Sequence, residues 1–458
     1  MTANRPAGGL PGKTLLARGG AAVDLLDDEA SALFARALGQ AVAEVGKVSS
    51  ALLLPPDITR FHSRAGLLTV AAHRELARAG ISVTIMPTLG THAPLTAAAR
   101  ERMYPGIPAA LFRVHDWRRD VVELGRIERE WVEGITEGAV CYDWPAQVNR
   151  LLRDGGFDLI VSLGQVVPHE VVGMANHAKN ILVGAGGKDA IDKSHFAGAA
   201  YGMEKLMGRT DTPVRAMFDE GLNRFADQLP PVFYALTVLN ARPAGKPAAS
   251  SADAEPCGEP ENALALRGLY CGFGRECFEQ ASALSRETNI ELLDEPVRKA
   301  VVYLAPEEFR STWLGNKAIY RTRMAMADGG ELIVIAPGLE RFGEDADIDK
   351  LIRKHGYRPA NTIRKKIAAD PELANSLSAA AHLIHGSSEG RFTVRYCPGP
   401  GISRGEIESV GFEWGDIAEA TARYDPRKLA AGWNTASDGE RVFFVPNPAL
   451  GLWANRDY

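Results

Sequence analysis

The chain lacks the features of several common protein classes. Its cysteines are few and odd in number among 458 residues, and no two have CxxC spacing: Cys141, Cys257, Cys271, Cys277 and Cys397. A disulfide framework or a cysteine zinc site is therefore not expected, and a reducing cytoplasm is the predicted location. No apolar run approaches the roughly 20 residues that span a bilayer. The N-terminal stretch shows no apolar signal-peptide core.

An excess of positive charge is also missing. The formal net charge is −5, and short basic clusters such as Arg118-Arg119 are typical of solvated helix faces. A general nucleic-acid or acidic-membrane binder normally carries a basic face, so neither partner is expected. With 46% hydrophobic and 24% charged residues, the composition is that of a globular protein.

What the sequence does contain is an alternation of strand-like and helix-like segments. In the first half the helical spacing covers 31–46 and 64–80, and the strand-like runs are 49–55, the start of 81–92, 157–165 and 180–187. In the second half a strand is predicted over 296–306, a helix over 308–328 and a strand over 331–338. The pattern predicts an α/β protein of two domains, each with a mostly parallel sheet flanked by helices.

The predicted domains are residues 1–285 and residues 286–458, and a ligand site is expected in the cleft between them. A segment rich in Pro, Ala, Ser and Glu, residues 241–261, is predicted to be a flexible loop. Such a cleft can open and close during a reaction.

Polar side chains follow three of the predicted strands. Asp57 and Arg60 follow 49–55, His92 follows the strand that begins at 81, and His169 follows 157–165. Ligands of open α/β sheets bind at the carboxyl ends of the strands. We therefore expect these side chains to converge at one edge of the sheet.

The stretch 168–196 is unusually rich in titratable groups and glycine. Its GAGGKD segment (184–189) is neither a G-x-x-x-x-G-K-[ST] phosphate loop nor G-x-G-x-x-G, although its backbone amides could hold a phosphate. His169, His177 and His195 lack the HExxH spacing of a zinc site, and nothing in their spacing favours one. His382 and His385, three apart on a predicted helix end, fit a capping or interface role at least as well as binding.

Together these motifs resemble the lactate racemase family, which uses a nickel-pincer nucleotide. The D-x-T-R motif is residues 57–60, G-T-H is 90–92, and P-H-x-x-x-G-x-x-x-x-x-K runs from Pro168 to Lys179, followed by His195. The segment W-L-G-N-K (313–317) resembles the family's aromatic-x-x-x-Lys helix.

The resemblance implies that the cofactor, pyridinium-3,5-bisthiocarboxylic acid mononucleotide nickel, is attached to Lys179. His195 would be the protein ligand of the nickel, which suits soft sulfur and imidazole donors. The remaining cofactor contacts implied are Thr91, Gly184, Gly186 and Lys188. Proteins of cofactor synthesis would be transient partners.

The resemblance also implies roles in a hydride-transfer racemisation of a 2-hydroxy acid. His92 and His169 would be the two bases, one for the hydroxyl proton of each enantiomer. Arg60 and Lys317 would hold the carboxylate and developing charge. Asp57 would orient Arg60 or a histidine, and Trp313 would wall the pocket.

The chain departs from the family pattern around the pocket. It has Asn176-His177 where the family often has glycines, Ala93 where it often has arginine, and Phe61-His62-Ser63-Arg64 after D-x-T-R. A more polar wall with His177 as a substrate contact predicts a sugar acid such as gluconate or mannonate, epimerised at carbon 2. The alternatives are racemisation of a small acid of the lactate or malate type, a zinc-dependent hydrolase and a non-catalytic sugar-acid binding protein.

Overall fold

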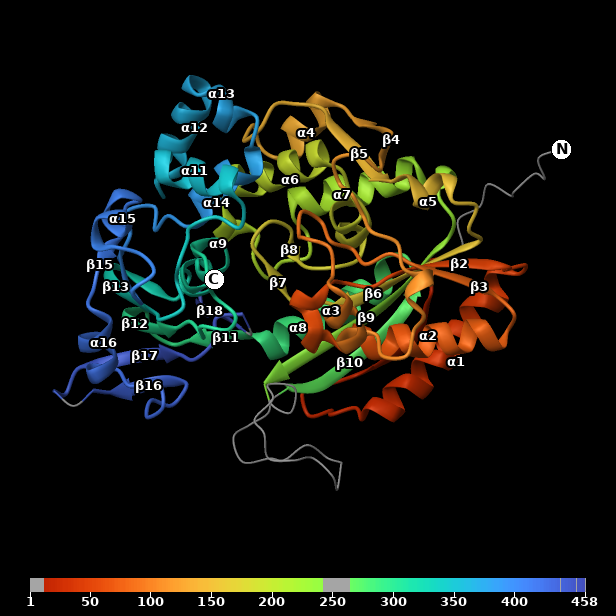
Figure 1. The fold of residues 1–458 in the computed structure, drawn as a ribbon, viewed down its shortest axis with the longest axis horizontal. Coiled ribbons are helices and arrows are strands. Elements are labelled where there is room, and N and C mark those ends of the chain that lie inside the picture. The colour runs from red at the N-terminus through yellow and green to blue at the C-terminus, as the bar shows by residue number, and fades with distance from the viewer. Residues whose placement is uncertain (1–11, 242–263, 437, 450, 458) are drawn as a thin grey trace. The chain divides into compact units, whose positions relative to one another are not determined.

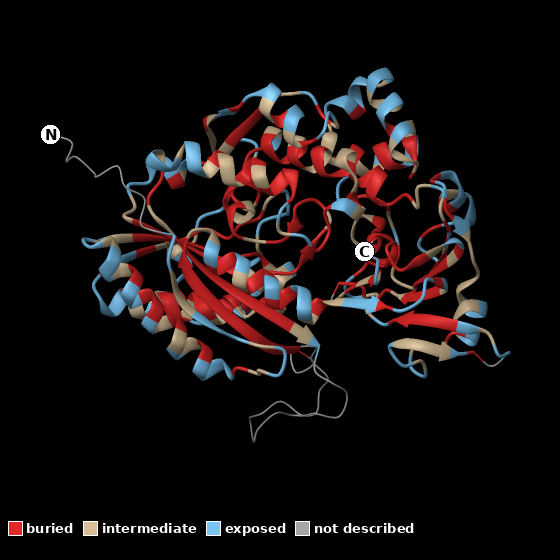
Figure 2. Ribbon diagram, turned by 180° about the vertical axis from the view of Figure 1, so that it is seen from behind, coloured by how far each residue is buried: buried red, intermediate tan, exposed pale blue. Residues whose placement is uncertain are grey.

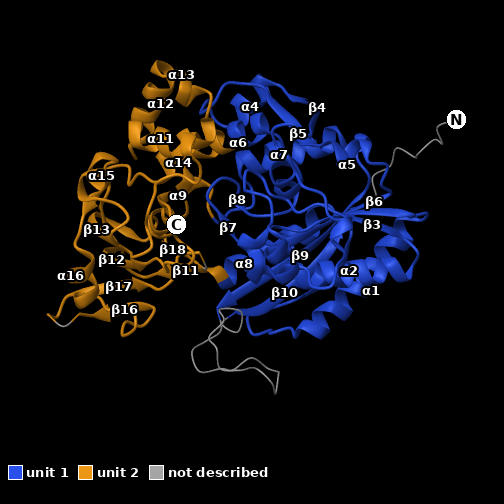
Figure 3. Cartoon of the chain, viewed as in Figure 1, with its two compact units in different colours: residues 1–194, 208–288 blue, residues 195–207, 289–458 orange. Residues whose placement is uncertain are grey.

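The protein is described by a computed structural model that covers residues 12–241, 264–436, 438–449 and 451–457. Its contacts divide the chain into two compact units, residues 1–194 with 208–288 and residues 195–207 with 289–458 (Figure 3). The segment 195–207, which the sequence prediction assigned to the first domain, thus packs with the second unit. The predicted loop over 241–261 lies outside the described residues except for residue 241.

The first unit is built on a six-stranded sheet of order β1-β10-β9-β6-β2-β3. The pairs β9–β6, β6–β2 and β2–β3 are parallel, whereas β1–β10 and β10–β9 are antiparallel. The strand β2 is buried from Ala51 to Leu54, as expected for a parallel strand covered on both faces. Helix α1 contacts β1 and β10, and α2 contacts β3 and β6 (Figure 1).

The strands of this unit are β1 (Thr14–Gly19), β2 (Ser50–Leu54), β3 (Ser82–Ile85), β4 (Val121–Ile127), β5 (Trp144–Asn149), β6 (Leu159–Gln165), β7 (Pro168–His169), β8 (Gly173–Met174), β9 (Val232–Ala241) and β10 (Leu264–Phe273). Its longer helices are α1 (Asp27–Val45), α2 (Ala65–Arg78), α3 (Ala97–Met103), α4 (Arg129–Ile135), α5 (Arg150–Asp154), α6 (Lys188–Tyr201, which continues into the second unit), α7 (Pro213–Arg224) and α8 (Arg275–Asn289). The pairs β4–β5 and β7–β8 form two separate two-stranded sheets outside the main sheet.

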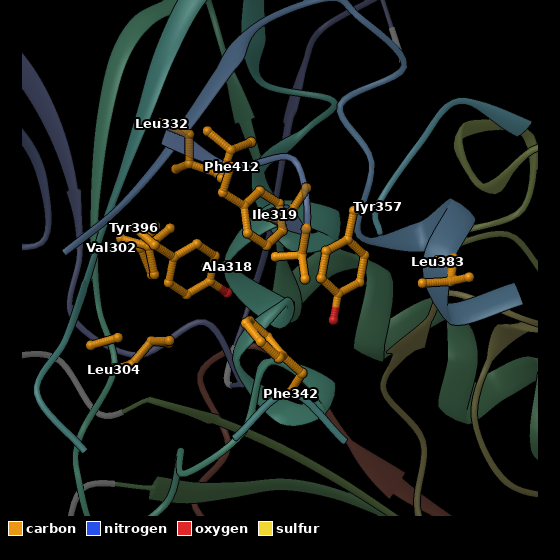
Figure 4. Close-up of a cluster of buried hydrophobic side chains, with 14 of the residues drawn as sticks. Val302, Leu304, Ala318, Ile319, Leu332, Phe342, Tyr357, Leu383, Tyr396 and Phe412 are labelled. Atoms are coloured by element: carbon orange, nitrogen blue, oxygen red, sulfur yellow. The ribbon is translucent and has the colours of Figure 1, made fainter. Parts of the chain in front are cut away.

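The second unit has a six-stranded sheet of order β15-β14-β13-β12-β17-β16, parallel except for the pair β16–β17. Successive residues of its central strands belong to different apolar clusters: Val302 and Val334 to one, Val301 and Ile333 to the other. Because successive side chains of a strand point to opposite faces, both faces of this sheet are buried (Figure 2). In the larger cluster Ile319 lies among Tyr357, Tyr396 and Phe412 (Figure 4).

The strands of this unit are β11 (Ile290–Leu293), β12 (Val297–Tyr303), β13 (Met326–Ala336), β14 (Thr393–Pro398), β15 (Glu413–Trp414), β16 (Gly432–Thr435), β17 (Arg441–Val445) and β18 (Leu452–Asn455). Its helices are α9 (Thr312–Gly315), α10 (Lys317–Thr322), α11 (Ala346–His355), α12 (Ala360–Ala369), α13 (Pro371–Ala374), α14 (Leu377–His385), α15 (Arg404–Ser409) and α16 (Ile417–Arg423). The predicted α/β class, with parallel-rich sheets and flanking helices, is confirmed. In the part of the chain that the structure describes, no helix has both the length and the apolar character needed to cross a membrane.

Two predictions of secondary structure are wrong. Residues 180–187 do not form a strand: Asn180–Gly184 is a short π-helical turn, η3, tied by the Asn180 side chain across strand ends instead of pairing along one. The single helix predicted over 308–328 is two short helices, because Ser311 caps α9 and the strand β13 already begins at Met326, opposite Val297.

Candidate functional site

The three strand ends that carry polar side chains are neighbours in the first unit. Strands β6, β2 and β3 lie side by side and run parallel, so their carboxyl ends share one edge of the sheet. The pairing continues past the strands, with a parallel bridge between Pro56 and Thr88. The convergence predicted from the sequence is therefore confirmed for these strands.

Asp57 and His92 form a hydrogen-bonded pair at this edge. Oδ2 of Asp57 lies 2.5 Å from Nδ1 of His92, and the other carboxylate oxygen accepts the backbone N–H of Thr59 at 3.0 Å. Burial alone would raise the pKa of Asp57, but the hydrogen bond and charge of His92, with the bonds from Thr59, lower it below its ordinary value. Asp57 is 4% exposed, whereas the His92 side chain is 48% exposed. The ionised carboxylate thus fixes one ring nitrogen of an imidazole that solvent and ligands can reach. Asp57 was predicted to orient either Arg60 or a histidine, and this hydrogen bond orients a histidine.

His169 ends the two-residue strand β7 and is nearly buried, at 8% exposure. Its Nδ1 accepts the backbone N–H of Val171 at 3.1 Å. A carboxylate oxygen of Glu170 lies 3.6 Å from the same nitrogen. The two candidate bases therefore have different neighbours at Nδ1, a side-chain carboxylate for His92 and a backbone amide for His169.

Lys179 is the N-cap residue of η3 and is partly buried. Burial, followed by the positive charges of Arg60 and Arg215, lowers the pKa of Lys179 to about 8, while Glu170 and Asp57 act in the opposite direction. These electrostatic neighbours come from the loops after two strands, which places the lysine in the group that includes Asp57, Arg60 and Glu170. An amine with this pKa has a neutral, nucleophilic fraction of about one tenth at pH 7, far more than an ordinary lysine has.

Asn180, the next residue, was not foreseen from the sequence. Its side-chain amide donates to the Leu54 carbonyl at 3.1 Å and to Ser162 Oγ at 2.9 Å, and its carbonyl oxygen accepts from Thr88 Oγ1 at 2.8 Å. One side chain thereby joins the turn after Lys179 to β2, to β6 and to the loop after β3. Its position next to the expected attachment lysine could have marked Asn180 as a candidate site residue. Its hydrogen-bond partners could not be predicted, because they lie far away in the sequence.

His115 and Asn149 donate hydrogen bonds to the glycine-rich segment after η3. His115 Nε2 donates to the Gly186 carbonyl at 3.0 Å, and the backbone N–H of Asn149 donates to Ala185 at 2.6 Å. A Cβ atom at Gly184 would come within 2.8 Å of Thr88, and one at Gly186 within 2.0 Å of the Leu182 carbonyl. Close protein packing therefore requires both glycines, and their predicted contact with a cofactor phosphate stays a prediction.

Lys188 and His195 lie on helix α6. Lys188 pairs with Asp192 one turn later, and its side chain is 49% exposed. Positions 188, 192 and 195 fall on one face of a helix, since their spacings are four and three residues. Thr91 follows Gly90, whose N–H donates to the Gly184 carbonyl at 2.9 Å.

His177 occupies a different environment from the one predicted. Its ring lies between Tyr234 and Phe278, with centroid distances of 4.2 and 5.1 Å, and its Nε2 donates to the Gly274 carbonyl at 3.1 Å. Burial and the charge of Arg215 lower its pKa to about 3, so the ring is neutral. These contacts give His177 a packing role, and a contact with substrate remains only a prediction.

Arg215, a fully buried residue on α7, supports the loop before Lys179. Its guanidinium donates to the carbonyls of Met174 at 2.5 Å and Asn176 at 3.2 Å and stacks 4.3 Å from the Phe278 ring centroid. Burial lowers the pKa of Arg215 to about 10, which leaves it charged at neutral pH.

The segment after D-x-T-R is also engaged with protein groups. Arg64 pairs with Asp27 at 3.3 Å, and the guanidinium of Arg102 stacks 4.3 Å from the Phe61 ring. Ser63 is fully buried, and its carbonyl accepts from Thr237. Much of the polarity that predicted a more polar pocket wall therefore serves protein contacts.

Trp313 and Lys317 belong to the second unit, on α9 and at the start of α10. The Trp313 ring lies 4.2 Å from that of His382, whose Nε2 is 3.0 Å from the Tyr357 hydroxyl. Lys317 Nζ lies 5.6 Å from the Phe309 ring centroid. His382 thus supports the predicted pocket tryptophan, while His385 lies edge-on to Tyr320.

Among the described residues no three His, Cys, Asp or Glu side chains come together as a metal site. A zinc centre of three protein ligands thus has no support in that part of the chain. Coordination by one histidine together with a cofactor's own atoms needs no such cluster.

Comparison with known proteins finds one family whose model matches part of this chain. Residues 37–206 match the family described as "Lactate racemase N-terminal domain". No curated protein sequence matches the chain. This matched range contains Asp57, His92, His169, Lys179 and His195.

Two solved structures share the fold. A Thermotoga maritima protein from a structural genomics consortium is 23% identical, with a TM-score of 0.75 over 96% of this chain and 100% of that one. The lactate racemase apoprotein of Thermoanaerobacterium thermosaccharolyticum is 13% identical, with a TM-score of 0.68 over 96% of this chain and 94% of that one. At these identities the likeness establishes the fold alone.

Proposed function

We propose that this chain, whose residues 37–206 match the lactate racemase N-terminal domain family, inverts carbon 2 of a 2-hydroxy acid. The observation that carries the proposal is a pair of histidines that follow β3 and β6, the two strands on either side of β2, each with a carboxylate close to its Nδ1, together with a lysine whose amine is partly neutral. Racemisation needs two proton-transfer groups because the hydroxyl of each enantiomer requires its own.

We assign the proton transfers to Nε2 of His92 and Nε2 of His169. Asp57 holds Nδ1 of His92, which leaves Nε2 to take the hydroxyl proton of one enantiomer, and the carboxylate stabilises the imidazolium that results. Arg60 follows Asp57 in the same loop and binds the substrate carboxylate with its planar guanidinium.

In this proposal the chain holds the nickel-pincer nucleotide expected for the family, and the partly neutral amine of Lys179 supports the attachment. Lys179 would attach it through its amine, and Thr91, Lys188 and the backbone of 184–186 would hold its phosphate. His195 would supply the imidazole ligand of the nickel. When bound, the nucleotide supplies an electrophilic acceptor for the hydrogen on carbon 2. Its loading requires transient encounters with cofactor-synthesis proteins.

The second unit contributes Trp313 and Lys317 in this proposal. Lys317 would bind the substrate carboxylate or the developing oxygen charge, and Trp313, braced by His382, would wall the substrate pocket. The placement of the active site between the domains stays part of the proposal.

For the substrate we propose a sugar acid of the gluconate and mannonate type, with lactate or malate as the alternative. Since His177 and residues 61–64 make protein contacts, the support for a sugar acid comes from Ala93, an exposed small residue beside His92 where the family often has arginine. A larger hydroxylated acid needs the space that an arginine side chain would occupy.

The test is intact mass and nickel content of protein made in a host that synthesises the cofactor, with the variant Lys179→Arg and, as control, Lys205→Arg, an exposed lysine next to Tyr201. We expect added mass on the peptide that contains Lys179, about one nickel per chain, and interconversion of aldonate epimers faster than of lactate enantiomers. Lys179→Arg should carry no added mass and show no activity, whereas Lys205→Arg should keep the attachment and the activity.

Active protein without added mass would contradict the cofactor assignment and favour metal-ion or metal-free chemistry. Loaded protein that converts lactate much faster than any aldonate would overturn the substrate assignment alone. Loaded protein inactive on every 2-hydroxy acid would favour a binding function.

A further inference from the structure

The two candidate bases are held in different tautomers. The Asp57 carboxylate can only accept a hydrogen bond, so the proton between it and His92 belongs to Nδ1, and neutral His92 has its lone pair on Nε2. The Val171 N–H can only donate, so Nδ1 of neutral His169 holds the lone pair, and its proton is on Nε2.

This difference has a chemical consequence. In the arrangement observed, Nε2 of His92 can accept a proton, but Nε2 of neutral His169 already carries one and can only donate it. Donation from that neutral tautomer would leave an imidazolate, a very poor product. For His169 to serve as a base, its proton must lie on Nδ1, where it would face the Val171 N–H as a second donor.

Glu170 is the group placed to resolve this conflict. Its Oε2 lies 3.6 Å from Nδ1 of His169, beyond hydrogen-bond length but within reach of a small side-chain rotation, and its side chain is 20% exposed. Once Nδ1 carries a proton, the carboxylate becomes its natural partner, and the Val171 amide is released.

We propose that Glu170 is a positioning residue that converts His169 from a proton donor into a proton acceptor by replacing the Val171 amide at Nδ1; this rests on the proposed function. The protons balance in each direction. His169 protonated on both nitrogens, with Nδ1–H on Glu170, gives its Nε2 proton to the substrate oxygen and becomes neutral with the lone pair on Nε2. The reverse step takes the hydroxyl proton of that same enantiomer back onto Nε2. His92 makes the same transfers without a change of partner, because Asp57 holds its Nδ1 in both states.

The experiment reads the tautomers directly by ring ¹⁵N chemical shifts of histidine-labelled, cofactor-free protein. His92→Gln and His169→Gln assign the signals. At neutral pH we expect a protonated Nδ1 for His92 and a protonated Nε2 for the neutral form of His169. In Glu170→Gln, the ratio of Nδ1-protonated to Nδ1-free His169 at a given mildly acidic pH should fall about fivefold or more, since a nearby charge is lost.

The control is Glu123→Gln, an exposed glutamate paired with Arg126, which should leave the ratio unchanged. An unchanged His92 signal shows that Glu170→Gln is folded, and Glu170→Asp, which keeps the charge, should restore part of the ratio. Neutral His169 with its proton on Nδ1 in the wild type, or a ratio that changes less than twofold in Glu170→Gln, overturns the proposal.

The activity of the loaded protein distinguishes a failure of the Glu170 proposal from a failure of the proposed function. If the wild type racemises a 2-hydroxy acid but Glu170→Gln matches it in both rate and tautomer ratio, Glu170 has no switching role while the proposed function stands. If the tautomer ratio responds to Glu170 but loaded protein acts on no 2-hydroxy acid, the proposed function fails and the proton-transfer role falls with it.

Discussion

Asp57 is a buried carboxylate whose charge decides how His92 can act. Its lowered pKa keeps it ionised at neutral pH, and its hydrogen bond selects the tautomer of His92 that has a lone pair on Nε2. An amide in its place could present either a donor or an acceptor to the ring and would no longer select a tautomer.

We therefore expect Asp57→Asn to lower kcat by about 10²- to 10⁴-fold, the usual contribution of a positioned acid–base group, with a smaller change in KM. The measurement is steady-state racemisation by loaded protein. Thr59→Ala is the control, because it removes one bond to Asp57 but keeps the carboxylate on His92. Equal losses in the two variants would contradict the assignment.

The same residue predicts a pH dependence of stability. The folded-state pKa of Asp57 lies below its ordinary value of 3.8, so its contribution is fully present above that value and is lost as the pH falls through the lowered pKa. In urea unfolding between pH 6 and about pH 2, wild type should lose more free energy of unfolding than Asp57→Asn. Parallel curves for the two proteins would refute this.

Lys179 should titrate near pH 8 in the cofactor-free protein. Removing the Arg60 charge should raise that pKa, because a nearby cation disfavours the charged amine. Brief acylation across a pH series, with mass analysis of the Lys179 peptide, should show slower labelling of Arg60→Ala at pH 7.5, whereas Arg60→Lys should resemble wild type. Faster labelling of Arg60→Ala would contradict the assigned electrostatics.

At the scale of elements, the turn η3 is placed by one side chain. Asn180 bonds to groups on β2, on β6 and in the loop after β3, and this cross-link sets the position of Lys179 relative to the strand ends. A strand at 180–187 would have lacked this cross-link, and Lys179 would then have a different position relative to the strand ends.

Asn180→Ala should lower the free energy of unfolding by about 1–3 kcal/mol, since it leaves the Ser162 and Leu54 groups with an unmade hydrogen bond. It should also reduce the fraction of chains modified at Lys179. Urea unfolding and intact mass measure the two effects. Ser162→Ala removes a single partner and should cost less; a larger loss there than in Asn180→Ala would contradict the role of the asparagine.

At the scale of the whole molecule, the second compact unit is built from two separate segments of the chain. Residues 195–207 belong to the second unit, where Met203 and Met207 pack with Tyr320 and Met324. Glu204 of the same segment forms an ion pair at 2.7 Å with Arg323, which is 2% exposed.

A fragment of residues 289–458 should consequently be unstable by itself. Emptying the space of a buried methionine costs about 2–5 kcal/mol, and Arg323 would lose its partner. Circular dichroism and urea unfolding should show a weaker transition than for the same fragment joined by a flexible linker to residues 195–207. Equal stability of the two fragments would show that the segment contributes little.

The sequence by itself determined the α/β class and the meeting of polar groups at one sheet edge. Apolar strand runs and helical spacing are local patterns, and the ends of adjacent parallel strands meet whatever their side chains are. Asp57, His92 and His169 could therefore be selected before any coordinates were known, whereas Lys179 was selected through the resemblance to the family. The helix predicted over 308–328 failed because local spacing does not register the pairing of Met326 with Val297.

Only the tertiary structure decided what each of these groups touches. Asp57 and His92 are 35 positions apart, and Asn180 and Leu54 are 126 apart. No local pattern reports such contacts, and none showed that His177 is packed between Tyr234 and Phe278. Chain folding sets which polar groups are buried together, and burial with its partners then sets charge and tautomer, which local sequence alone does not encode.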